Sequence, residues 1–546
     1  MTLQGFRGTY RIDDDARGVY SEAAGIGRIV PRAVAVPADA EDVVTLATWA
    51  QGTHTPLVPR GAGSSMAGAA IGDGVVVDLS QLKAIGSVDA LTHRIWVGPG
   101  AVRDAVNNAA AAHGLWFPVD PSSGAWATIG GMVATNAAGP HTLKHGAMRR
   151  WVTALDCVFD DGSRAMIRRG AELPTQARTV PAIRRFSTQA MSTILTTAMA
   201  EPIAKIRHAG VRKESSGYAL VDFANSGDLV DLIVGSEGTL ALIVGVELQL
   251  APIPRGRAAV GAGFRTLEAA VDAASRATTL GAATCELLDR TFLDVVRRGS
   301  AAVSLPKDIE ALLLLDAESG SQEDADALAG EISRAFEALG ATALTVASTP
   351  DAIAALWQVR HAASPMLAEM SDVGISMQFI EDSAVPPHAL PEYVRGVRDI
   401  LEHYGFTGVI FGHAGDGNVH VNPLVNIQSD GWRSRIESVL NEVVTLTAVL
   451  GGTLTGEHGD GRLRTPFMER VWANDAMVLF DLVKRCFDPR GILNPGVKVA
   501  LPGQTALGDI KFDPALPPLT TAARRALDEV ARTRGYGAFR LDLLRS

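Results

Sequence analysis

The sequence predicts an α+β protein built from several domains. Its 546 residues are too many for one hydrophobic core, so two or three domains are expected. Hydrophobic residues make up 47% of the chain and aromatic residues only 5%, and 55 residues are glycine, a composition typical of closely packed helices and strands joined by tight turns. Amphipathic helices and short strands alternate along the chain, which favours mixed domains.

The first half of the chain alternates strand-like and helical segments. These are, in order, a strand and turn at 28–42, a helix at 41–51, strands at 56–59, 75–79 and 94–97, and a helix at 102–113. The triplet Asp160-Asp161-Gly162 is typical of a hairpin turn. Pro252 and Pro254 follow a strand-like segment, so the first domain boundary is placed there.

The second half continues the alternation and is typical of a sheet with helices on one face. Helices are expected at 267–280, 322–339 and 391–404, and strands at 311–315 and 409–412. A surface helix is expected at 521–534, within a proline-rich tail. The predicted division is an N-terminal extension at 1–27, a first domain at 28–254, a second domain at 255–450, a C-terminal segment at 451–500 and a tail at 501–546.

Charge and cysteine content exclude several classes of function. Fifty basic and 60 acidic residues give a net charge of −10, the wrong sign for a nucleic-acid partner. The three cysteines, Cys157, Cys285 and Cys486, form no CxxC pair, which argues against disulfides, a thiolate zinc site and an iron–sulfur cluster. Without a signal peptide or a long apolar span, we expect a cytoplasmic protein with at most peripheral membrane contact.

A first glycine-rich loop follows the strand at 56–59 and combines small residues with hydroxyl groups (PRGAGSSMAG). Such a loop can turn several backbone N–H groups toward one anion, and Arg60 adds positive charge. The spacing matches neither the GxxxxGK[ST] loop nor the GxGxxG turn of a βαβ unit. Taken alone, the loop is explained equally well as a surface turn without a ligand.

Two further loops favour a large ligand. The segment 120–139 (DPSSGAWATIGGMVATNAAG) again combines small residues with hydroxyl and amide groups, and the segment 234–240 (VGSEGTL) leads directly into a strand. In order and approximate spacing, the three loops resemble the vanillyl-alcohol oxidase, or PCMH-type, FAD-binding domain. The resemblance extends over residues 28–254.

The resemblance implies a set of FAD-binding residues. The pyrophosphate is expected at Pro59, Arg60, Gly61, Ala62, Gly63, Ser64, Ser65 and Gly68. The ribityl and isoalloxazine side is expected at Pro121, Ser123, Thr128, Gly130, Gly131, Thr135 and Asn136, and the adenosine half at Glu237, Gly238 and Ile243. The first loop has no histidine, so FAD is expected to be non-covalent. Trp126 and Met132 stand where relatives more often have small or amide side chains, which is expected to alter the flavin environment.

Two histidines in the segment FGHAGDGNVH can meet only if the chain turns between them. On one straight strand His413 and His420 would lie about 23 Å apart, and on one helix about 10 Å apart. Metal ligands must each lie about 2 Å from the ion. The glycine-rich residues 414–418 supply such a turn, so both imidazoles are expected to meet.

The segment TGEHGDGR adds Glu457 and His458. Neighbours on an extended backbone point in opposite directions, so one of them is expected to join the histidines while the other faces another part of the pocket. The natural division makes Glu457 the third ligand of a His₂Glu metal site and His458 a general base. The alternative is that all four are structural, hydrogen-bonded residues of glycine-rich hairpins.

GHAGDGNVH and TGEHGDG resemble the paired signatures of the FAD-linked oxidase C-terminal domain of D-lactate, glycolate and D-2-hydroxyglutarate dehydrogenases. The resemblance now covers residues 28–500, and it implies a ferredoxin-like substrate or cap domain, a C-terminal helical segment and an Asn494 close to the flavin. It also implies oxidation of a small D-2-hydroxy acid to the 2-oxo acid by hydride transfer to flavin N5. A divalent metal, zinc or manganese, is expected to assist.

Arg360, in the segment WQVR, aligns with the substrate-binding arginine of these dehydrogenases, where a guanidinium suits a carboxylate. Its alternative interpretation is an exposed helix arginine. The stretch 375–382 lacks the lysine found in D-2-hydroxyglutarate dehydrogenases, which favours a monocarboxylate without excluding hydroxyglutarate.

The electron acceptor is expected to be a separate quinone, cytochrome, iron–sulfur or flavoprotein partner, since TGEHGDGR also resembles larger members with an iron–sulfur module and this chain lacks the cysteines for one. A homodimer is compatible with the sequence. Two alternative functions are a flavin-binding electron-transfer subunit of a larger complex and a non-redox flavoenzyme resembling alkylglycerone-phosphate synthase.

Overall fold

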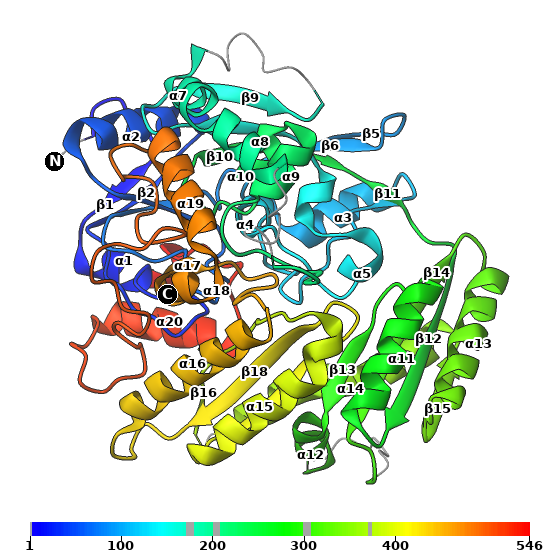
Figure 1. The fold of residues 1–546 in the computed structure, drawn as a ribbon. Coiled ribbons are helices and arrows are strands. Elements are labelled where there is room, and N and C mark those ends of the chain that lie inside the picture. Colours follow the sequence, from blue (N-terminus) through cyan, green and yellow to red (C-terminus); the bar gives the residue numbers. More distant parts are fainter. Residues whose placement is uncertain (1–2, 171–178, 200–207, 299–306, 370–373, 546) are drawn as a thin grey trace.

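The computed structural model describes residues 3–170, 179–199, 208–298, 307–369 and 374–545, and it confirms the predicted α+β class (Figure 1). Among the described residues, a four-stranded sheet, a five-stranded sheet and a two-stranded ribbon lie in the N-terminal half, and a seven-stranded sheet occupies the second half. Orange C-terminal helices return to the N-terminal half, as Figure 1 shows. Within the described residues, no helix has both the length and the apolar character needed to cross a membrane.

The first sheet has the order β1-β2-β4-β3, with β2, β4 and β3 parallel and β1 antiparallel at the edge. Its inner strands are buried apolar runs, as expected for parallel strands covered on both sides. The Asp39 carboxylate caps the helix that follows β2 by accepting from two backbone N–H groups. The elements are β1 (Thr9–Arg11), α1 (Asp14–Val19), β2 (Ala33–Val36), α2 (Ala40–Thr53), β3 (Leu57–Arg60) and β4 (Val75–Asp78).

The second sheet is antiparallel, in the order β5-β6-β10-β8-β9. The predicted hairpin joins β8 to β9, and the amide of Gly162 donates to the carbonyl of Phe159 within its turn. The strands are β5 (Ile85–Asp89), β6 (Arg94–Val97), β8 (Val152–Val158), β9 (Arg164–Arg168) and β10 (Leu242–Gln249). The helices near it are α3 (Arg103–Ala111), α4 (Ile129–Thr135), α5 (Thr142–His145), α7 (Pro181–Gln189), α8 (Met191–Met199), α9 (Leu220–Ser226) and α10 (Leu229–Ile233). A two-stranded ribbon pairs β7 (Leu115–Trp116) with β11 (Ala251–Pro252).

The third sheet is antiparallel throughout, in the order β15-β12-β14-β13-β17-β18-β16. Its strands are β12 (Gly256–Phe264), β13 (Glu286–Asp289), β14 (Ala311–Ser319), β15 (Ala343–Ala347), β16 (Ile375–Ser376), β17 (Thr407–His413) and β18 (Asn418–Val425). The helices around it are α11 (Leu267–Leu280), α12 (Arg290–Arg298), α13 (Gln322–Ala338), α14 (Pro350–Glu369), α15 (Leu390–His403) and α16 (Trp432–Val449).

The expectation of helices on only one face of this sheet was wrong. Leu287 belongs to the core beneath α11, α13, α15 and α16, whereas its neighbour Leu288 belongs to a separate core with α12 and α14. Strand β14 contains four consecutive leucines and is buried along nearly its whole length, and such a strand needs a cover on both faces. The side that carries α14 is also the side on which the candidate site lies.

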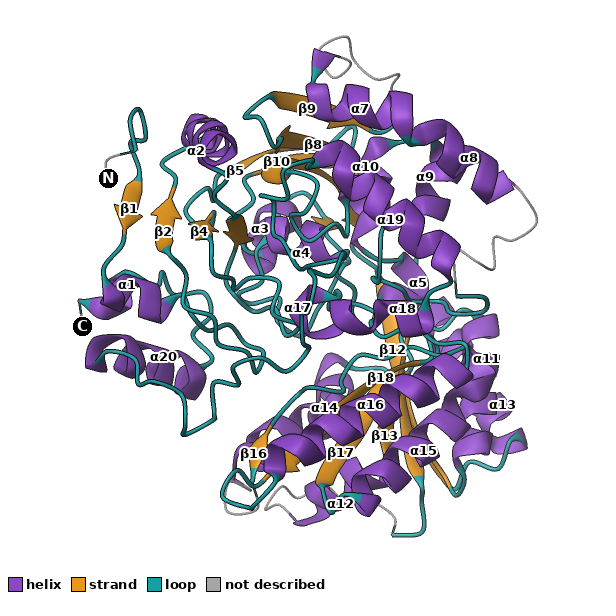
Figure 2. Cartoon of the chain, turned by 60° about the vertical axis from the view of Figure 1, so that its left-hand side comes forward, coloured by secondary structure: helices purple, strands orange, loops and turns teal. Residues whose placement is uncertain are grey.

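The C-terminal segments pack back onto the beginning of the chain. After α17 (Gly461–Arg464), α18 (Met468–Val471) and α19 (Asn474–Phe487), the backbone of Leu493 pairs with that of Leu57 in the first sheet. The predicted tail helix is present as α20 (Thr521–Thr533), and it lies beside α1, as Figure 2 shows. The two ends of the described chain therefore share one small core.

Candidate active site

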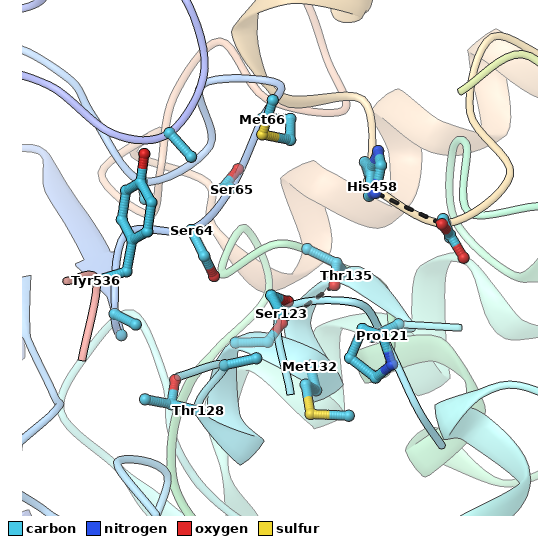
Figure 3. Close-up of a pocket in the computed structure, with 18 of the residues that line it drawn as sticks. Ser64, Ser65, Met66, Pro121, Ser123, Thr128, Met132, Thr135, His458 and Tyr536 are labelled. Carbon is cyan, nitrogen blue, oxygen red and sulfur yellow. Dashed lines mark hydrogen bonds and ion pairs between the residues drawn. The ribbon is translucent and has the colours of Figure 1, made fainter. Parts of the chain in front are cut away.

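A cavity of ≈ 750 Å³ lies between the N-terminal loops and the third sheet, a size typical of small-molecule and cofactor sites. All three glycine-rich loops contribute to its lining, as do α14, β17, β18 and the C-terminal tail. In Figure 3, His458 and Tyr536 lie on opposite sides of the view, with Ser64 and Ser123 between them.

Most of the predicted FAD-binding residues line this cavity. They are Pro59, Arg60, Gly61, Ala62, Gly63, Ser64, Ser65, Pro121, Ser123, Thr128, Gly130, Gly131, Thr135, Glu237, Gly238 and Ile243. Gly68, Asn136 and Asn494 lie outside the lining. Asn136 accepts from the amide of Arg149 at the end of α4, and the Asn494 amide group donates to the carbonyls of Ala69 and Glu237. These two asparagines therefore stabilise the backbone around the loops through hydrogen bonds outside the cavity lining.

Close backbone approach holds the three loops together. A Cβ atom on Gly61 would lie 2.1 Å from the Thr128 hydroxyl, and one on Gly238 would lie 2.2 Å from the Pro59 ring. Neither position has room for a side chain, so close packing between the loops requires glycine at both. The first loop thus contacts both of the others and borders an internal cavity, unlike a surface turn without a ligand.

Hairpin geometry brings the two predicted histidines together. The turn at 414–417 joins β17 to β18, and His420 stands opposite Phe411 while His413 stands opposite Asn418. The histidines are diagonal neighbours on one face of the hairpin, where side chains can touch. Their Nε2 atoms are 3.4 Å apart, so the predicted meeting of the two imidazoles is confirmed.

Glu457 completes a triangle with these histidines. Its Oε1 atom lies 3.5 Å from His413 Nε2 and 3.2 Å from His420 Nε2, and all three residues are buried. Ligands about 2.0–2.1 Å from a tetrahedral ion are separated from one another by about 3.3 Å. The donor atoms are therefore spaced as one face of a metal site, so the residues fit a divalent ion.

Two further buried groups hold this triangle in place. The Glu286 carboxylate pairs with His413 Nδ1, and Lys213 Nζ lies 2.8 Å from the outer oxygen of Glu457. Burial opposes the charged form of His413, but Glu286 and Glu457 together outweigh it and raise the pKa of His413 to about 9. Burial likewise opposes the charged form of Glu457, but Lys213 and His413 hold its pKa well below the usual range. The supporting groups bind the outer atoms of His413 and Glu457, so the inner atoms, His413 Nε2 and Glu457 Oε1, can bind a shared ligand together with His420 Nε2.

Sequence reasoning missed both supporting groups. Glu286 begins β13 directly before two buried leucines, a pattern that signals a buried acid in need of a partner. Lys213 follows a segment outside the described residues, and its local sequence carries no comparable signal.

His458 lies beside the triangle and faces the cavity. Its Nδ1 atom is 2.7 Å from the Glu381 carboxylate, its ring stacks on that of His420 at 5.4 Å, and 31% of its side chain is exposed. Burial favours the neutral ring, but Glu381, Asp382 and Glu457 together outweigh it and raise the pKa of His458 to about 10. Glu457 and His458 diverge less than expected, with 3.5 Å between Oε1 and Nε2, because these residues form a bend and not an extended strand.

Arg360 lines the same cavity from α14. Its Nε atom lies 3.1 Å from Glu286, its guanidinium lies 4.3 Å from the centre of the Phe411 ring, and 14% of its side chain is exposed. It is therefore not an exposed helix arginine. Nearby, Gln378 from the lysine-free stretch 375–382 donates to Asn422 at 2.7 Å, and both neutral amides line the cavity.

The comparisons with known proteins agree with this geometry. The family described as FAD binding domain matches residues 31–166, and the family described as FAD linked oxidases, C-terminal domain, matches residues 253–497. The D-lactate dehydrogenase of Archaeoglobus fulgidus is 30% identical over 478 residues, which cover 86% of this chain and 92% of the relative. The chain belongs to the FAD-linked oxidases. The predicted PCMH-type FAD-binding domain and the oxidoreductase class are thereby confirmed.

Other similar FAD-linked oxidases carry different substrate names. The glycolate oxidase subunit GlcD of Bacillus subtilis is 29% identical to this chain. The match covers 90% of this chain and 94% of GlcD. A D-2-hydroxyglutarate dehydrogenase of Pseudomonas putida is 27% identical over 92% of this chain, which spans only 52% of that longer relative. Among solved structures, an alkyldihydroxyacetonephosphate synthase matches with a TM-score of 0.61 at 15% identity, covering 89% of this chain and 83% of the synthase. At that identity, the likeness shows the fold alone.

Proposed function

We propose that this FAD-linked oxidase is a dehydrogenase that oxidises a small D-2-hydroxy acid, similar to lactate or glycolate, to the 2-oxo acid. The observation that carries the proposal is the triangle of His413, His420 and Glu457 beside His458 and Arg360, in the cavity that the FAD loops also line. Relatives that act on glycolate and D-lactate support the substrate class, and the D configuration is taken from their names.

Arg360 binds the substrate carboxylate in this proposal. A planar guanidinium offers two parallel donors to a carboxylate, and Glu286 fixes its orientation from the Nε side. The carboxylate is thereby held while carbon 2 is aligned for reaction, which contributes through positioning.

His458 accepts the proton of the substrate 2-hydroxyl. Glu381 holds its Nδ1 atom, which leaves Nε2 for the hydroxyl group. The imidazole must be neutral for this role. His413, His420 and Glu457 would hold a divalent cation close to His458, and that positive charge would disfavour imidazolium there, against the effect of the neighbouring carboxylates.

His413, His420 and Glu457 would hold a divalent metal, zinc or manganese. Such an ion, when bound, lowers the pKa of a hydroxyl group close to it. Glu286 and Lys213 keep two of the ligands in their observed orientation, as supporting groups commonly do in metal sites.

The three loops would hold FAD non-covalently, and the flavin would supply the acceptor for the hydride from carbon 2. A separate quinone, cytochrome, iron–sulfur protein or flavoprotein then takes the electrons. The neutral Gln378 and Asn422 favour a monocarboxylate over hydroxyglutarate, because a second carboxylate would need a cation.

The proposal is tested by mixing the FAD-loaded protein anaerobically with D- and L-2-hydroxy acids and following flavin absorbance, with and without a chelator. We expect D-lactate or glycolate to bleach the flavin, and the chelator to slow the bleaching. A flavin that no 2-hydroxy acid bleaches would overturn the proposal in favour of an electron-transfer subunit. Turnover without net flavin reduction would instead support chemistry like that of the synthase.

A further inference from the structure

The C-terminal tail reaches the FAD loops, although it lies beyond the family match that ends at residue 497. Helix α20 is anchored on α1, where Ala523 contacts Gly18, and the left-handed backbone of Arg534 turns the chain toward the cavity. Ala531, Arg534 and Tyr536 belong to the cavity lining. Figure 3 shows Tyr536 on the side of Ser64 and Ser65.

Arg540 ties the tail directly to the first glycine-rich loop. Its Nη2 atom donates to the carbonyl of Ala62 at 3.3 Å, and Nη1 donates to the carbonyls of Gly535 and Ala538. The residue is only 3% exposed, and its Nε atom has no partner among the described residues. An unpaired donor on a buried cation is costly unless a ligand satisfies it.

Positive charge is concentrated around this loop. Arg60 is 2% exposed, stacks on Tyr20 and donates to three backbone carbonyls. Burial and the nearby Arg60 lower the pKa of Arg540 to about 10. Within the described part of the chain, neither of these arginines nor Arg534 forms an ion pair with a carboxylate. One buried carboxylate, Asp78, attracts both arginines while it accepts from Tyr20, so two buried cations share a single buried anion and have capacity for another.

Aromatic contacts connect the tail to the second loop. The Tyr536 and Trp126 rings lie 6.3 Å apart, and Gly537 packs against Trp126. The Arg540 guanidinium lies 5.7 Å from the centre of the Tyr536 ring. The tail therefore bridges the first and second loops across one end of the cavity.

We propose that residues 531–540 complete the FAD site: Arg534 and Arg540 offset the charge of the FAD diphosphate, and Tyr536 covers the cofactor together with Trp126. A diphosphate would add negative charge here: Arg534, which lines the cavity, can reach it through charge-assisted hydrogen bonds, and the buried Arg540, which is not part of the lining, acts through its charge. The inference rests on FAD binding by the family and not on the proposed hydroxy-acid substrate.

The test measures FAD binding to the full-length apoprotein by quenching of FAD fluorescence. We expect Arg534→Ala and Tyr536→Ala each to raise the Kd for FAD about tenfold, with an unchanged unfolding temperature of the apoprotein. Tyr536→Phe keeps the ring and should bind normally. Arg532→Ala is the matched control, since Arg532 is 72% exposed, pairs with Glu529 and does not line the cavity.

ADP, which carries the same diphosphate, separates the two roles. ADP competes with FAD for the same site. In Arg534→Ala, the affinity for ADP should fall by the same factor as the affinity for FAD. Unchanged ADP competition with weakened FAD binding would overturn the assignment of Arg534 to the diphosphate. Wild-type Kd values for FAD in both alanine variants would overturn the whole proposal. Neither measurement involves turnover, so the result stands apart from the identity of the substrate.

Discussion

The Nε2 atom of His420 lies 3.2 Å from the Oε1 atom of Glu457, although the two residues come from different segments of the chain. No single element sets this distance. The β17–β18 hairpin places the imidazole, and the backbone amide of Glu457 is held by the Asp382 carboxylate at 3.2 Å. His420 and Glu457 are thus fixed independently, and their separation suits two ligands of the same metal ion.

His420→Ala should remove the bound metal. The variant keeps the hairpin but loses one of three donor atoms, and affinity for a divalent ion falls steeply when a protein ligand is lost. Metal content per chain, measured by elemental analysis after dialysis, should drop well below that of the wild type. His403→Ala, on the exposed end of α15, is the control. Unchanged metal content in His420→Ala would exclude His420 from the ligand set.

His458→Ala should slow reduction of bound flavin by substrate about 10²- to 10⁴-fold, the range for loss of a general base. The FAD content of this variant should equal that of the wild type, because His458 does not belong to the three glycine-rich loops that are proposed to bind FAD. Rapid mixing under anaerobic conditions gives the rate directly. Reduction at the wild-type rate would rule out the proposed proton transfer.

Arg360→Ala should lower kcat/KM about 100-fold, mainly through KM, because the charged hydrogen bonds to the substrate carboxylate are lost. Arg360→Lys should recover only part of this loss, since a lysine keeps the charge without the planar pair of donors. Steady-state kinetics with an artificial acceptor measure both. If the lysine and alanine variants both behaved like the wild type, the carboxylate would bind elsewhere.

His141 links the flavin loops to the third sheet and should make stability depend on pH. Its Nδ1 atom lies 2.6 Å from Asp120 and its Nε2 atom 3.1 Å from Glu318. Burial favours the neutral ring, but the two carboxylates outweigh it and raise the pKa of His141 to about 10. Because the folded pKa is raised, the stabilisation is complete below about pH 6.5 and is lost as the pH rises through about 10.

His141→Gln should therefore lower the unfolding free energy by roughly 4 kcal/mol at pH 7. The difference from the wild type should shrink toward pH 10, as measured by urea unfolding across the pH range. His113→Gln, on an exposed loop, is the control. A difference that did not vary between pH 7 and pH 10 would mean that His141 is neutral in the folded protein.

Local features of the site could be predicted from the sequence, and contacts between distant segments could not. The turn after His413 is encoded by neighbouring glycines, so the meeting of the two histidines followed from chain geometry alone. Glu286, Glu381 and Lys213 reach the same site from separate segments, and only the tertiary structure brings them together.

The same limit applies to the fold. The helices at 267–280 and 521–533 follow their sequence patterns closely, because an amphipathic stripe and a capping residue are local signals. The second covered face of the third sheet was missed, since a short apolar strand gives the same pattern whether one or two layers cover it. Tyr536 gave no signal, because a lone aromatic in a tail does not reveal its neighbour.

The bond from Arg540 to Ala62 has a consequence for how the protein matures. Ribosomes release the N-terminal domain first, so the FAD loops can form long before the residues near 540 emerge. Until then, one end of the cavity stays open and a cofactor that enters early can leave again. On the proposed role of residues 531–540, we expect secure retention of FAD to be a late event in biosynthesis, because these residues are translated long after the loops that they contact.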